Sequence, residues 1–311
     1  MSILLITNKQ DITTDFRLNT EDIGRSIDLT FDFIDNRFFL LDGYQGKTID
    51  LLQIKSVYYR RPEIGFYDEG LSDGEARFVR AELLYTLEGL YQILDHARWL
   101  NKVQPIRNAE NKIYQLLLAK RIGFQMPASI ITNEPKQALH FYEQQNESCI
   151  IKPIKSGLVG GAKEEGVIFT SRLLLNNENA LRIKHCPTYI QTLIPKRTDI
   201  RVTVVGNRVF AAKIHSQNDQ ESSVDWRKSE VPLPHSSFQL PEELEEKCKT
   251  LVKALDLQYG AIDFIEDTDG NFVFLEINPN GQWAWIENRL NLNISDAITE
   301  YLAGGEMVYS T

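Results

Sequence analysis

The sequence predicts an α/β protein in which an N-terminal open sheet is followed by a larger region of strands and helices. Three patterns support this fold class. Residues 1–65 alternate short apolar runs with turn residues, which is typical of strands. A helical pattern follows from residue 72. Residues 259–278 form two apolar segments joined by Asp269-Gly270, as in a β-hairpin.

The composition narrows the classes of function. The chain has 311 residues, enough for two or three compact units, and is 42% hydrophobic and 25% charged, as soluble globular proteins are. The net charge of -9 argues against nucleic acid or an anionic membrane as the main partner, because both attract basic surfaces. The start, Met1 to Ile6, lacks a basic leader, and no apolar run approaches the roughly 20 residues that span a bilayer. We therefore expect a cytoplasmic protein.

The cysteine and histidine residues give no metal or nucleophile signature. They do not form CxxC, HExxH or comparable ligand spacings, so no transition metal is assigned. Small core residues in a reducing compartment are the simplest interpretation of the cysteines. The residues concerned are Cys149, Cys186, Cys248, His96, His140, His185, His215 and His235.

The first third of the chain is predicted to form a domain of its own. Ser72-Asp73-Gly74-Glu75 is a capping box, so a helix should begin there and continue to Leu94. The helical pattern breaks around Gln104-Pro105, where we place a domain boundary. The strands expected before the helix are Ile3–Ile6, Phe38–Leu41 and Ser56–Tyr59.

The rest of the chain alternates strands with helices. Gly123 closes a helix over residues 109–122, and Pro241 opens another with its apolar residues on one face. A glycine-rich loop follows the strand Cys149–Lys152, and the next strand is expected to resume at Val167. The remaining predicted strands are 189–194 and 200–214, with a turn at Gly206-Asn207 in the second segment.

The C-terminal hairpin brings two carboxylates together. If Asp269-Gly270 is a two-residue type I′ turn, Ile265 pairs with Phe274. In the same register, Asp263 lies directly opposite Glu276. The other face of the hairpin would then be apolar core, formed by Ile262, Phe264, Leu275 and Ile277.

Asp263, Glu276 and Asn278 form a candidate magnesium site. Asn278 lies two residues beyond Glu276 on the same face of its strand. Carboxylates facing each other at about 5 Å repel, and a hard cation with oxygen ligands offsets this repulsion. A solvated acidic edge without a ligand is the alternative interpretation.

Lysines and glycines indicate a candidate phosphate site. Lys152 ends an apolar strand directly before a glycine-rich stretch, whose backbone N–H groups can approach phosphate oxygens. The stretch matches neither the Walker A nor the GxGxxG pattern, and a flexible surface loop explains it equally well. Lys112 begins its helix and, taken alone, fits a solvated surface lysine.

A strand that contains Gln191 is a candidate adenine site. Tyr189 to Pro195 is a strand that runs into a loop, so its backbone and the Gln191 amide are placed to bind an adenine edge. An ordinary strand is the alternative.

Two arginines are candidates for the reacting phosphate and for the substrate. A two-residue turn at Gly206-Asn207 pairs Arg201 with Ala212 and puts Lys213 on the opposite face, so we favour Arg201 as the cation of the site. Arg227 follows Asp225-Trp226 in a polar segment, where a plain surface arginine is equally compatible.

The order of these motifs resembles the ATP-grasp superfamily over residues 106–311. Finer details are similar to the microviridin-type graspetide synthetases, also called ω-ester peptide macrocyclases. The stretches that carry this resemblance are Tyr58–Pro62, Lys213–Gln217 with Asp225–Arg227, and Phe274–Trp283. It implies an α+β ATP-grasp fold with a pre-ATP-grasp domain (1–105), a central subdomain with a phosphate lid (106–185) and a C-terminal subdomain with the Mg²⁺ site (186–311).

The resemblance also implies a role for each candidate residue. The ATP phosphates would be held by Lys112, Lys152 and a lid formed by Lys155, Ser156, Gly157, Gly160 and Gly161. Adenine would be bound by Gln191 and the backbone near Leu193 and Ile194, and ribose by Asp199. A pair of Mg²⁺ ions would be held by Asp263, Glu276 and Asn278. The catalytic residues would be Arg201 and Lys152, which face the transferred phosphoryl group, and Arg227, which anchors a substrate carboxylate.

The implied activity is closure of rings in a ribosomally made precursor peptide that carries a leader segment. Asp or Glu side chains would be activated as acyl phosphates and joined to Thr, Ser or Lys side chains, by an enzyme expected to be a homodimer. One rival is a RimK-like ligase that joins free amino acids to a protein or small acid. A second rival is a nucleotide- or peptide-binding module without turnover.

Overall fold

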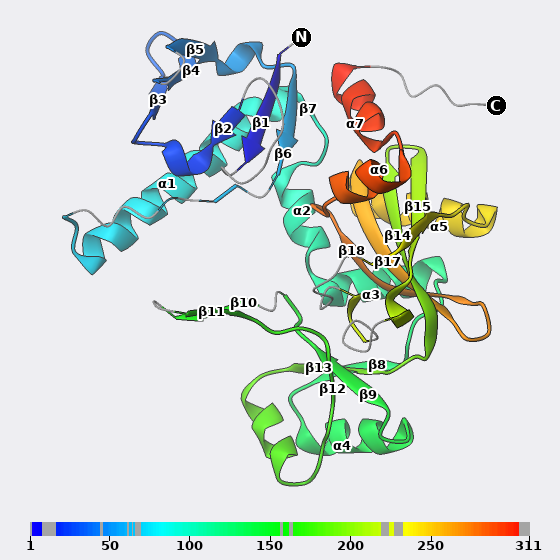
Figure 1. Ribbon diagram of the computed structural model, residues 1–311. Coiled ribbons are helices and arrows are strands. Elements are labelled where there is room, and N and C mark those ends of the chain that lie inside the picture. Colours follow the sequence, from blue (N-terminus) through cyan, green and yellow to red (C-terminus); the bar gives the residue numbers. More distant parts are fainter. Residues whose placement is uncertain are drawn as a thin grey trace. The chain divides into compact units, whose positions relative to one another are not determined.

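The computed structural model describes residues 2–7, 17–43, 46–60, 62–63, 65, 70–155, 158–161, 164–218, 224–226 and 233–304, with backbone alone for 158–161, 164–167 and 218. The chain forms two compact units (Figure 1). One unit runs to Ile106 and resumes at Ser295, and the other comprises Arg107–Ile294. Within the described residues, none of the helices is long and apolar enough to cross a membrane.

The first unit contains two sheets among its described residues, where the sequence suggested one open sheet. The bounds are β1 (Ile3–Thr7), β2 (Arg17–Asn19), β3 (Ile27–Asp32), β4 (Arg37–Asp42), β5 (Lys47–Asp50), β6 (Ser56–Tyr59) and β7 (Arg98–Trp99). Strands β2-β1-β6-β7 form a parallel sheet, and β3-β4-β5 form a separate antiparallel sheet. The predicted strand Phe38–Leu41 is confirmed within β4, but it belongs to the second sheet.

The predicted capping box begins helix α1 (Asp73–Ile93). Ser72 Oγ accepts a hydrogen bond from the Glu75 N–H, and the Glu75 carboxylate accepts one from the Ser72 N–H at 2.8 Å. The C-terminal half of the helix buries Leu87 and Leu90 in the core of this unit. Local capping chemistry and helical periodicity therefore predicted this element correctly.

Helix α7 (Ile294–Ala303) returns the chain to the first unit. The Ser56 hydroxyl donates to the Leu302 carbonyl, and Arg98 Nη1 donates to the Tyr301 carbonyl at 3.3 Å. The other passage between the units lies within helix α2 (Val103–Ala109). Pro105 is the third residue of α2, a position in the first turn where the missing N–H costs no helical hydrogen bond.

The second unit begins with an antiparallel sheet in the order β12-β9-β13-β8. Its strands and the neighbouring elements are α3 (Lys112–Ile122), β8 (Ser129–Thr132), α4 (Pro135–Gln144), β9 (Cys149–Lys152), β12 (Ser171–Arg172) and β13 (Thr188–Thr192). Gly123 ends α3 with φ of 86°, as predicted for its C-cap. The apolar residues that predicted α3 are not its core face, because Ile113 and Leu117 are exposed and Gln115 and Ala119 are buried instead.

The glycine-rich segment is a hairpin where it is described. Strands β10 (Leu158–Gly161) and β11 (Glu164–Val167) pair antiparallel, with Gly160 opposite Glu165. The expectation that a strand resumes at Val167 is wrong, because Val167 is the last residue of β11. Neither of the two short segments has a strand pattern in its sequence. They become strands because their backbones pair with each other.

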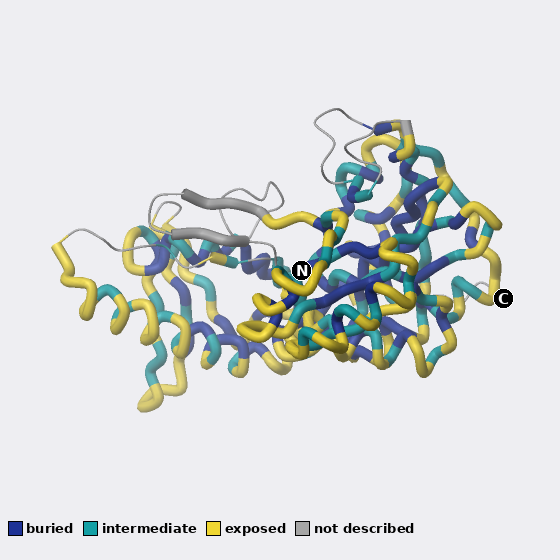
Figure 2. Tube along the Cα trace, turned by 90° about the horizontal axis from the view of Figure 1, so that it is seen from below, coloured by how far each residue is buried: buried dark blue, intermediate teal, exposed yellow. Residues whose placement is uncertain are grey.

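A five-stranded antiparallel sheet forms the centre of the second unit. Its order is β16-β15-β14-β17-β18, and β14 and β17 are buried along most of their length (Figure 2). The bounds are β14 (Lys196–Val205), β15 (Arg208–Ile214), β16 (His235–Ser237), β17 (Tyr259–Asp267) and β18 (Phe272–Asn278), with helices α5 (Glu242–Ala254) and α6 (Ala284–Leu290). Helix α5 packs on β14 and β17, and α3 packs on α5 and β18. The face of α5 that buries Cys248 and Leu251 was predicted correctly.

The turn of the C-terminal hairpin is longer than predicted. Phe264, and not Ile265, pairs with Phe274, and the Asp267 N–H donates to the Asn271 carbonyl at 3.0 Å. The loop therefore has three residues, with φ of 89° at Gly270. The Asp267 carboxylate accepts hydrogen bonds from the N–H groups of Asp269, inside the loop, and Asn271, directly after it.

A bulge at Leu275 restores the predicted register beyond this turn. Because Leu275 has no partner between the pairs Phe264–Phe274 and Asp263–Glu276, the pairing shifts by one residue. Leu275 was expected in the core, but it is half-buried and lines a pocket.

Candidate active site

Three charged residues form a row across the central sheet. Arg201 on β14 lies directly opposite Asp263 on β17, and Asp263 lies directly opposite Glu276 on β18. Residues that are direct cross-strand partners project from the same face. The predicted pairing of Asp263 with Glu276, and of Arg201 with Ala212, is confirmed.

Each carboxylate of the row has its own cation. Arg201 Nε lies 3.1 Å from Asp263 Oδ1, and Lys112 Nζ lies 3.2 Å from Glu276 Oε2. All four side chains are at most 16% exposed. The repulsion between Asp263 and Glu276 is therefore already offset by the protein, so repulsion alone is no argument for a metal ion here. Lys112 is also not the solvated surface lysine that its sequence position allowed, because it donates to the Pro153 carbonyl at 2.9 Å.

Asn278 lies next to this row. It pairs with Ala261, two residues from Asp263 on β17, and its Oδ1 accepts a hydrogen bond from the Asn280 N–H at 2.9 Å. Among the described residues, no group of three or more His, Cys, Asp and Glu side chains is placed to hold a metal. The available oxygen donors are thus two carboxylates and one carboxamide, which fits a Mg²⁺ ion that takes few protein ligands.

The strand-end lysine Lys152 is held by an aromatic ring. Lys152 lies directly across from Tyr189 on β13, and its ammonium is 6.0 Å from the centre of the Tyr189 ring. Burial raises the pKa of Tyr189 to about 12, with a further contribution from the charge of Glu276. The phenol is therefore neutral at physiological pH and supports the lysine by packing.

Gln191 is buried beside the same tyrosine. Its Nε2 donates to Tyr189 Oη at 2.8 Å, and the residue is 1% exposed. Next to it, the Leu193 N–H donates to the Ser148 carbonyl at 2.9 Å. The amide nitrogen of Gln191 and the N–H of Leu193 are thus engaged within the protein.

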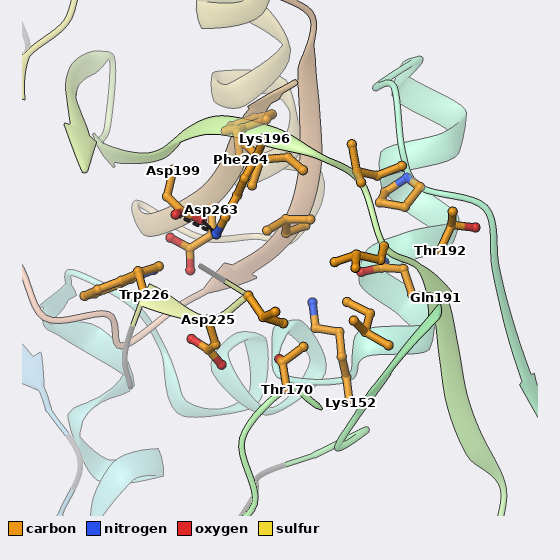
Figure 3. Close-up of a pocket in the computed structure, with 17 residues that line it drawn as sticks. Lys152, Thr170, Gln191, Thr192, Lys196, Asp199, Asp225, Trp226, Asp263 and Phe264 are labelled. Carbon is orange, nitrogen blue, oxygen red and sulfur yellow. Dashed lines mark hydrogen bonds and ion pairs between the residues drawn. The ribbon is translucent and has the colours of Figure 1, made fainter. Parts of the chain in front are cut away.

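A pocket with a volume of about 50 Å³ lies among these residues (Figure 3). Lys152, Gln191 and Asp263 line it, whereas Arg201, Glu276, Asn278 and Lys112 are not among its lining residues. The Lys152 ammonium and the Asp263 carboxylate point into it from different strands (Figure 3). Its apolar lining includes Pro127, Ile150, Leu193, Ile194, Ile265 and Leu275. A lining that combines apolar side chains with charged groups suits a nucleoside attached to phosphates.

Asp199 lines this pocket and forms an ion pair with Lys196 of the same strand, β14. Lys196 Nζ lies 2.8 and 2.7 Å from its two carboxylate oxygens, and the Ser216 hydroxyl also donates to it. Burial raises the pKa of Asp199, although Lys196 and Ser216 favour its charged form. Sequence reasoning missed Lys196. Its position three residues before Asp199 was the available signal, but an i,i+3 spacing on a strand does not normally bring side chains together; a β-bulge near Thr198 lets it do so.

Arg201 carries unused hydrogen-bonding capacity. Its Nη1 is buried without a hydrogen-bond partner, and Nε is near Asp263 without hydrogen-bond geometry. The guanidinium lies 5.7 Å from the ring centre of Trp226, and Trp226 lines the pocket. A buried, unpartnered guanidinium nitrogen is costly unless an acceptor such as a phosphate oxygen binds there.

The remaining predicted residues are only partly visible. Ser156, Gly157 and Arg227 lie outside the described residues, and only the backbone of Gly160 and Gly161 is described, within β10. Lys155 is exposed. Asp225, which sequence reasoning named only as part of the Arg227 motif, is buried in the pocket lining.

Lys213 faces away from the pocket, as the turn at Gly206-Asn207 predicted. It lies opposite Ile200, its ammonium is 2.6 Å from Glu266 Oε2, and it lies 4.5 Å from the ring centre of Phe238.

Comparison with known proteins gives a consistent result. The RimK-like ATP-grasp domain family matches residues 109–302, more than half of the chain. The structure is similar to the macrocyclase MdnC bound with precursor peptide MdnA from Microcystis aeruginosa MRC, with 26% identity, a TM-score of 0.86, and coverage of 98% of this chain and 100% of that chain. It is also similar to a Chryseobacterium gregarium RiPP-associated ATP-grasp ligase in complex with ADP and a leader and core peptide. That likeness has 27% identity, a TM-score of 0.87, and 98% coverage of both chains.

A curated relative is named for a reaction other than peptide macrocyclisation. The glutamate–LysW ligase ArgX of Sulfurisphaera tokodaii is 27% identical over 247 residues, which cover 76% of this chain and 84% of that protein.

Proposed function

Because the chain belongs to the RimK-like ATP-grasp family, we propose that it is an ATP-dependent ligase that closes rings in a ribosomally made precursor peptide. The observation that carries this proposal is the extent of the likeness. A peptide-bound macrocyclase and a peptide-bound ATP-grasp ligase align with 98% of the chain, so the likeness extends over residues 1–105 as well as over the family domain. We assign residues 1–105 as the pre-ATP-grasp domain, 106–185 as the central subdomain and 186–311 as the C-terminal subdomain, whose last residues, from Ser295, return to the first unit.

ATP would lie in the pocket that contains Lys152. Its apolar lining and Gln191 would hold adenine, with the backbone carbonyls near Leu193 and Ile194, and Asp199 would hold the ribose. Lys112, Lys152 and the lid from Lys155 to Gly161 would hold the phosphates. The fit is supported by the unpartnered Arg201 Nη1 and by the cluster of cations beside the two carboxylates.

Magnesium would be held by Asp263, Glu276 and Asn278, and when bound it would neutralise phosphate charge. Binding in this place requires Lys112 and Arg201 to turn from their carboxylate partners toward phosphate oxygens. Both cations lie at the carboxylates already, so the movement is a change of partner for each. Arg201 and Lys152 would then stabilise negative charge on the transferred group, which is the main source of rate in phosphoryl transfer.

The reaction balances as two substitutions. A peptide carboxylate oxygen bonds to the γ-phosphorus of ATP as the bond to ADP breaks, which gives an acyl phosphate. A hydroxyl or amine of the same peptide then bonds to the acyl carbon, phosphate leaves, and the nucleophile loses its proton. Each ring therefore removes one water from the peptide overall. Arg227 would anchor a peptide carboxylate. We also propose that the enzyme is cytoplasmic and forms a homodimer.

The test compares three substrates for the purified protein with Mg²⁺ and ATP. They are an acidic precursor peptide encoded beside this gene, the same peptide without its leader, and free glutamate. ADP release should be fastest with the complete peptide, and its mass should fall by one water per ring. Salt should weaken this reaction, because partly exposed ion pairs to the peptide are screened.

An amino-acid ligase is the second candidate, and the likeness to the glutamate–LysW ligase favours it. Turnover with free glutamate that equals turnover with the peptide, without any dehydrated peptide, would support this candidate and overturn the first. No turnover with any of the three substrates, together with tight nucleotide binding, would instead point to a binding module.

A further inference from the structure

Gln115 is a buried amide that pairs with the backbone of strand β18. Its Nε2 donates to the Ile277 carbonyl at 2.8 Å, and its Oε1 accepts from the Ile277 N–H at 3.1 Å. Nε2 also donates to the Ala109 carbonyl. The residue is 3% exposed and lies on α3, 162 positions before Ile277 in the chain. One side chain thus satisfies both polar backbone groups of Ile277.

This pairing replaces a missing strand. β18 is at the edge of the central sheet, so its outer N–H and C=O groups have no neighbouring strand. The Phe274 N–H donates to the Gln125 carbonyl at 2.8 Å, and the Ile277 N–H donates to the carboxamide oxygen of Gln115. Between these two points lies the bulge at Leu275. A bulge disrupts the ladder locally, and these two contacts bind the outer side of the strand before and after it.

Ile277 lies between two of the proposed magnesium ligands. Glu276 precedes it and Asn278 follows it, and both are half-buried. The backbone of this segment is held by β17 on its inner side and by Gln115 on its outer side. Rotation or slippage of Ile277 would change the direction of both neighbouring side chains, because adjacent side chains on a strand are fixed by one backbone.

The same helix also holds one ligand side chain directly. Lys112 is three residues before Gln115 on α3 and contacts Glu276 Oε2 at 3.2 Å. Residues at i and i+3 share a helix face. Helix α3 therefore contacts both the carboxylate of Glu276 and the peptide groups that follow it.

We propose that Gln115 is a positioning residue that sets the directions of Glu276 and Asn278 toward the metal–nucleotide complex. This inference rests on the proposed function, because it takes the metal to be bound by these two residues. Gln115 touches no reacting atom and acts through the backbone of Ile277. The contact also contributes to folding, so its test must separate metal binding from stability.

The experiment measures Mn²⁺, as a spectroscopic substitute for Mg²⁺, bound by the full chain with ADP, using electron paramagnetic resonance. Gln115→Met keeps the length of the side chain but removes donor and acceptor, and Gln115→Glu keeps an acceptor and removes the donor. Loss of a hydrogen bond that orients a metal ligand typically weakens metal binding about 10–100-fold, and we expect this for both variants. ADP affinity without metal should stay unchanged.

Tyr142→Phe is the matched control. It removes another hydrogen bond from a buried side chain to a carbonyl, from Tyr142 Oη on α4 to the Leu173 carbonyl, directly after β12, at 3.2 Å. We expect it to lower the unfolding temperature without changing Mn²⁺ affinity.

The outcomes separate this inference from the proposed function. If the wild-type protein binds no Mn²⁺ with ADP, the proposed function itself fails. If the wild type binds and the folded Gln115 variants bind with equal affinity, only the positioning role fails. The role also fails if the variants do not fold at the assay temperature, or if Tyr142→Phe weakens Mn²⁺ binding as much as they do.

Discussion

Arg201 and Asp263 face each other across strands β14 and β17, with Nε and Oδ1 3.1 Å apart and both side chains 8% exposed. Asp263 lines the pocket that contains Lys152, and Glu276 extends the row on the next strand. Substrate phosphates and a metal ion would each exchange with one member of this pair. The row can therefore be stable without ligands and still bind both.

Replacing Asp263 with asparagine should abolish ligation and also weaken the fold. A metal ligand should matter more than an orienting hydrogen bond, so turnover should fall by at least about 100-fold. Breaking a buried ion pair costs up to about 3–5 kcal/mol, because Arg201 is left uncompensated. ADP release and urea unfolding measure the two effects.

The control for this variant is Glu266→Gln on the same strand. Glu266 pairs with Lys213 at 2.6 Å and does not line the pocket. Its loss should leave turnover near the wild-type level. Wild-type turnover by Asp263→Asn at ordinary Mg²⁺ would show that Asp263 is not a ligand. We expect Glu276→Ala and Asn278→Ala to lose ligation as well.

Lys152→Met should weaken ATP binding much more than Lys213→Met. Lys152 points into the pocket, whereas Lys213 lies on the other face of its sheet beside Glu266. A hydrogen bond to a charged group contributes about 1.5–3 kcal/mol, so ATP affinity should fall at least about tenfold for Lys152→Met. Calorimetric titration with ATP measures both constants. Equal losses for the two variants would exclude Lys152 as the phosphate lysine.

Gly281→Ala should reduce both stability and turnover. A Cβ at this position would lie 2.3 Å from the Ala261 Cβ and 3.4 Å from Arg201 Nη1, so backbone or side chains must move. Overpacking of this kind costs about 1–3 kcal/mol, and here it displaces the row of charged residues. Thermal unfolding and ADP release are the measurements.

Gly89→Ala provides the opposite control for this glycine. Gly89 is inside α1, and a Cβ there would meet nothing within 4 Å. Alanine is favoured over glycine in a helix by about 0.5–1 kcal/mol, so the unfolding temperature should rise slightly with turnover unchanged. If Gly281→Ala changed the unfolding temperature and turnover no more than Gly89→Ala does, the close packing at Gly281 would not matter for activity.

His235 should make the protein less stable at acidic pH. Arg289 Nη1 donates to His235 Nδ1 at 3.0 Å, and burial lowers the pKa of this histidine below its usual 6.5, with Arg289 acting in the same direction. Because the folded state favours the neutral ring, its contribution to stability is present above pH 6.5 and is lost as the pH falls through the lowered pKa.

The measurement is the unfolding free energy of wild type and His235→Gln, by urea titration between about pH 7 and pH 5. Glutamine stays uncharged, so the variant should lose less stability on acidification than the wild type. Parallel pH profiles for the two proteins would contradict the assignment.

The sequence alone determined the elements and pairings that depend on neighbouring residues. The capping box at Ser72, the turn at Gly206-Asn207 and the pairing of Arg201 with Ala212 are all confirmed. They were predictable because capping and two-residue turns are decided within a few residues, and a strand alternates with period two.

The pairing of Asp263 with Glu276 was predicted correctly for an incomplete reason. The loop has one residue more than expected, and the bulge at Leu275 shifts the register back. The extra loop residue is supported by hydrogen bonds to the Asp267 carboxylate, a side-chain contact that the Asp269-Gly270 signal does not contain.

Only the tertiary structure decided which side chains meet at the site. Lys112 reaches Glu276, and Gln115 reaches Ile277, because α3 packs along the outer edge of β18. These partners are more than 160 positions apart, and hydrophobic periodicity does not encode the rotation of a helix against a distant strand. The apolar residues of α3 even suggested the wrong face, since Gln115 is buried and Ile113 is exposed. Packing against distant elements decided which face of α3 is buried. Gln115 can lie on that face because its amide is fully hydrogen-bonded to the backbone.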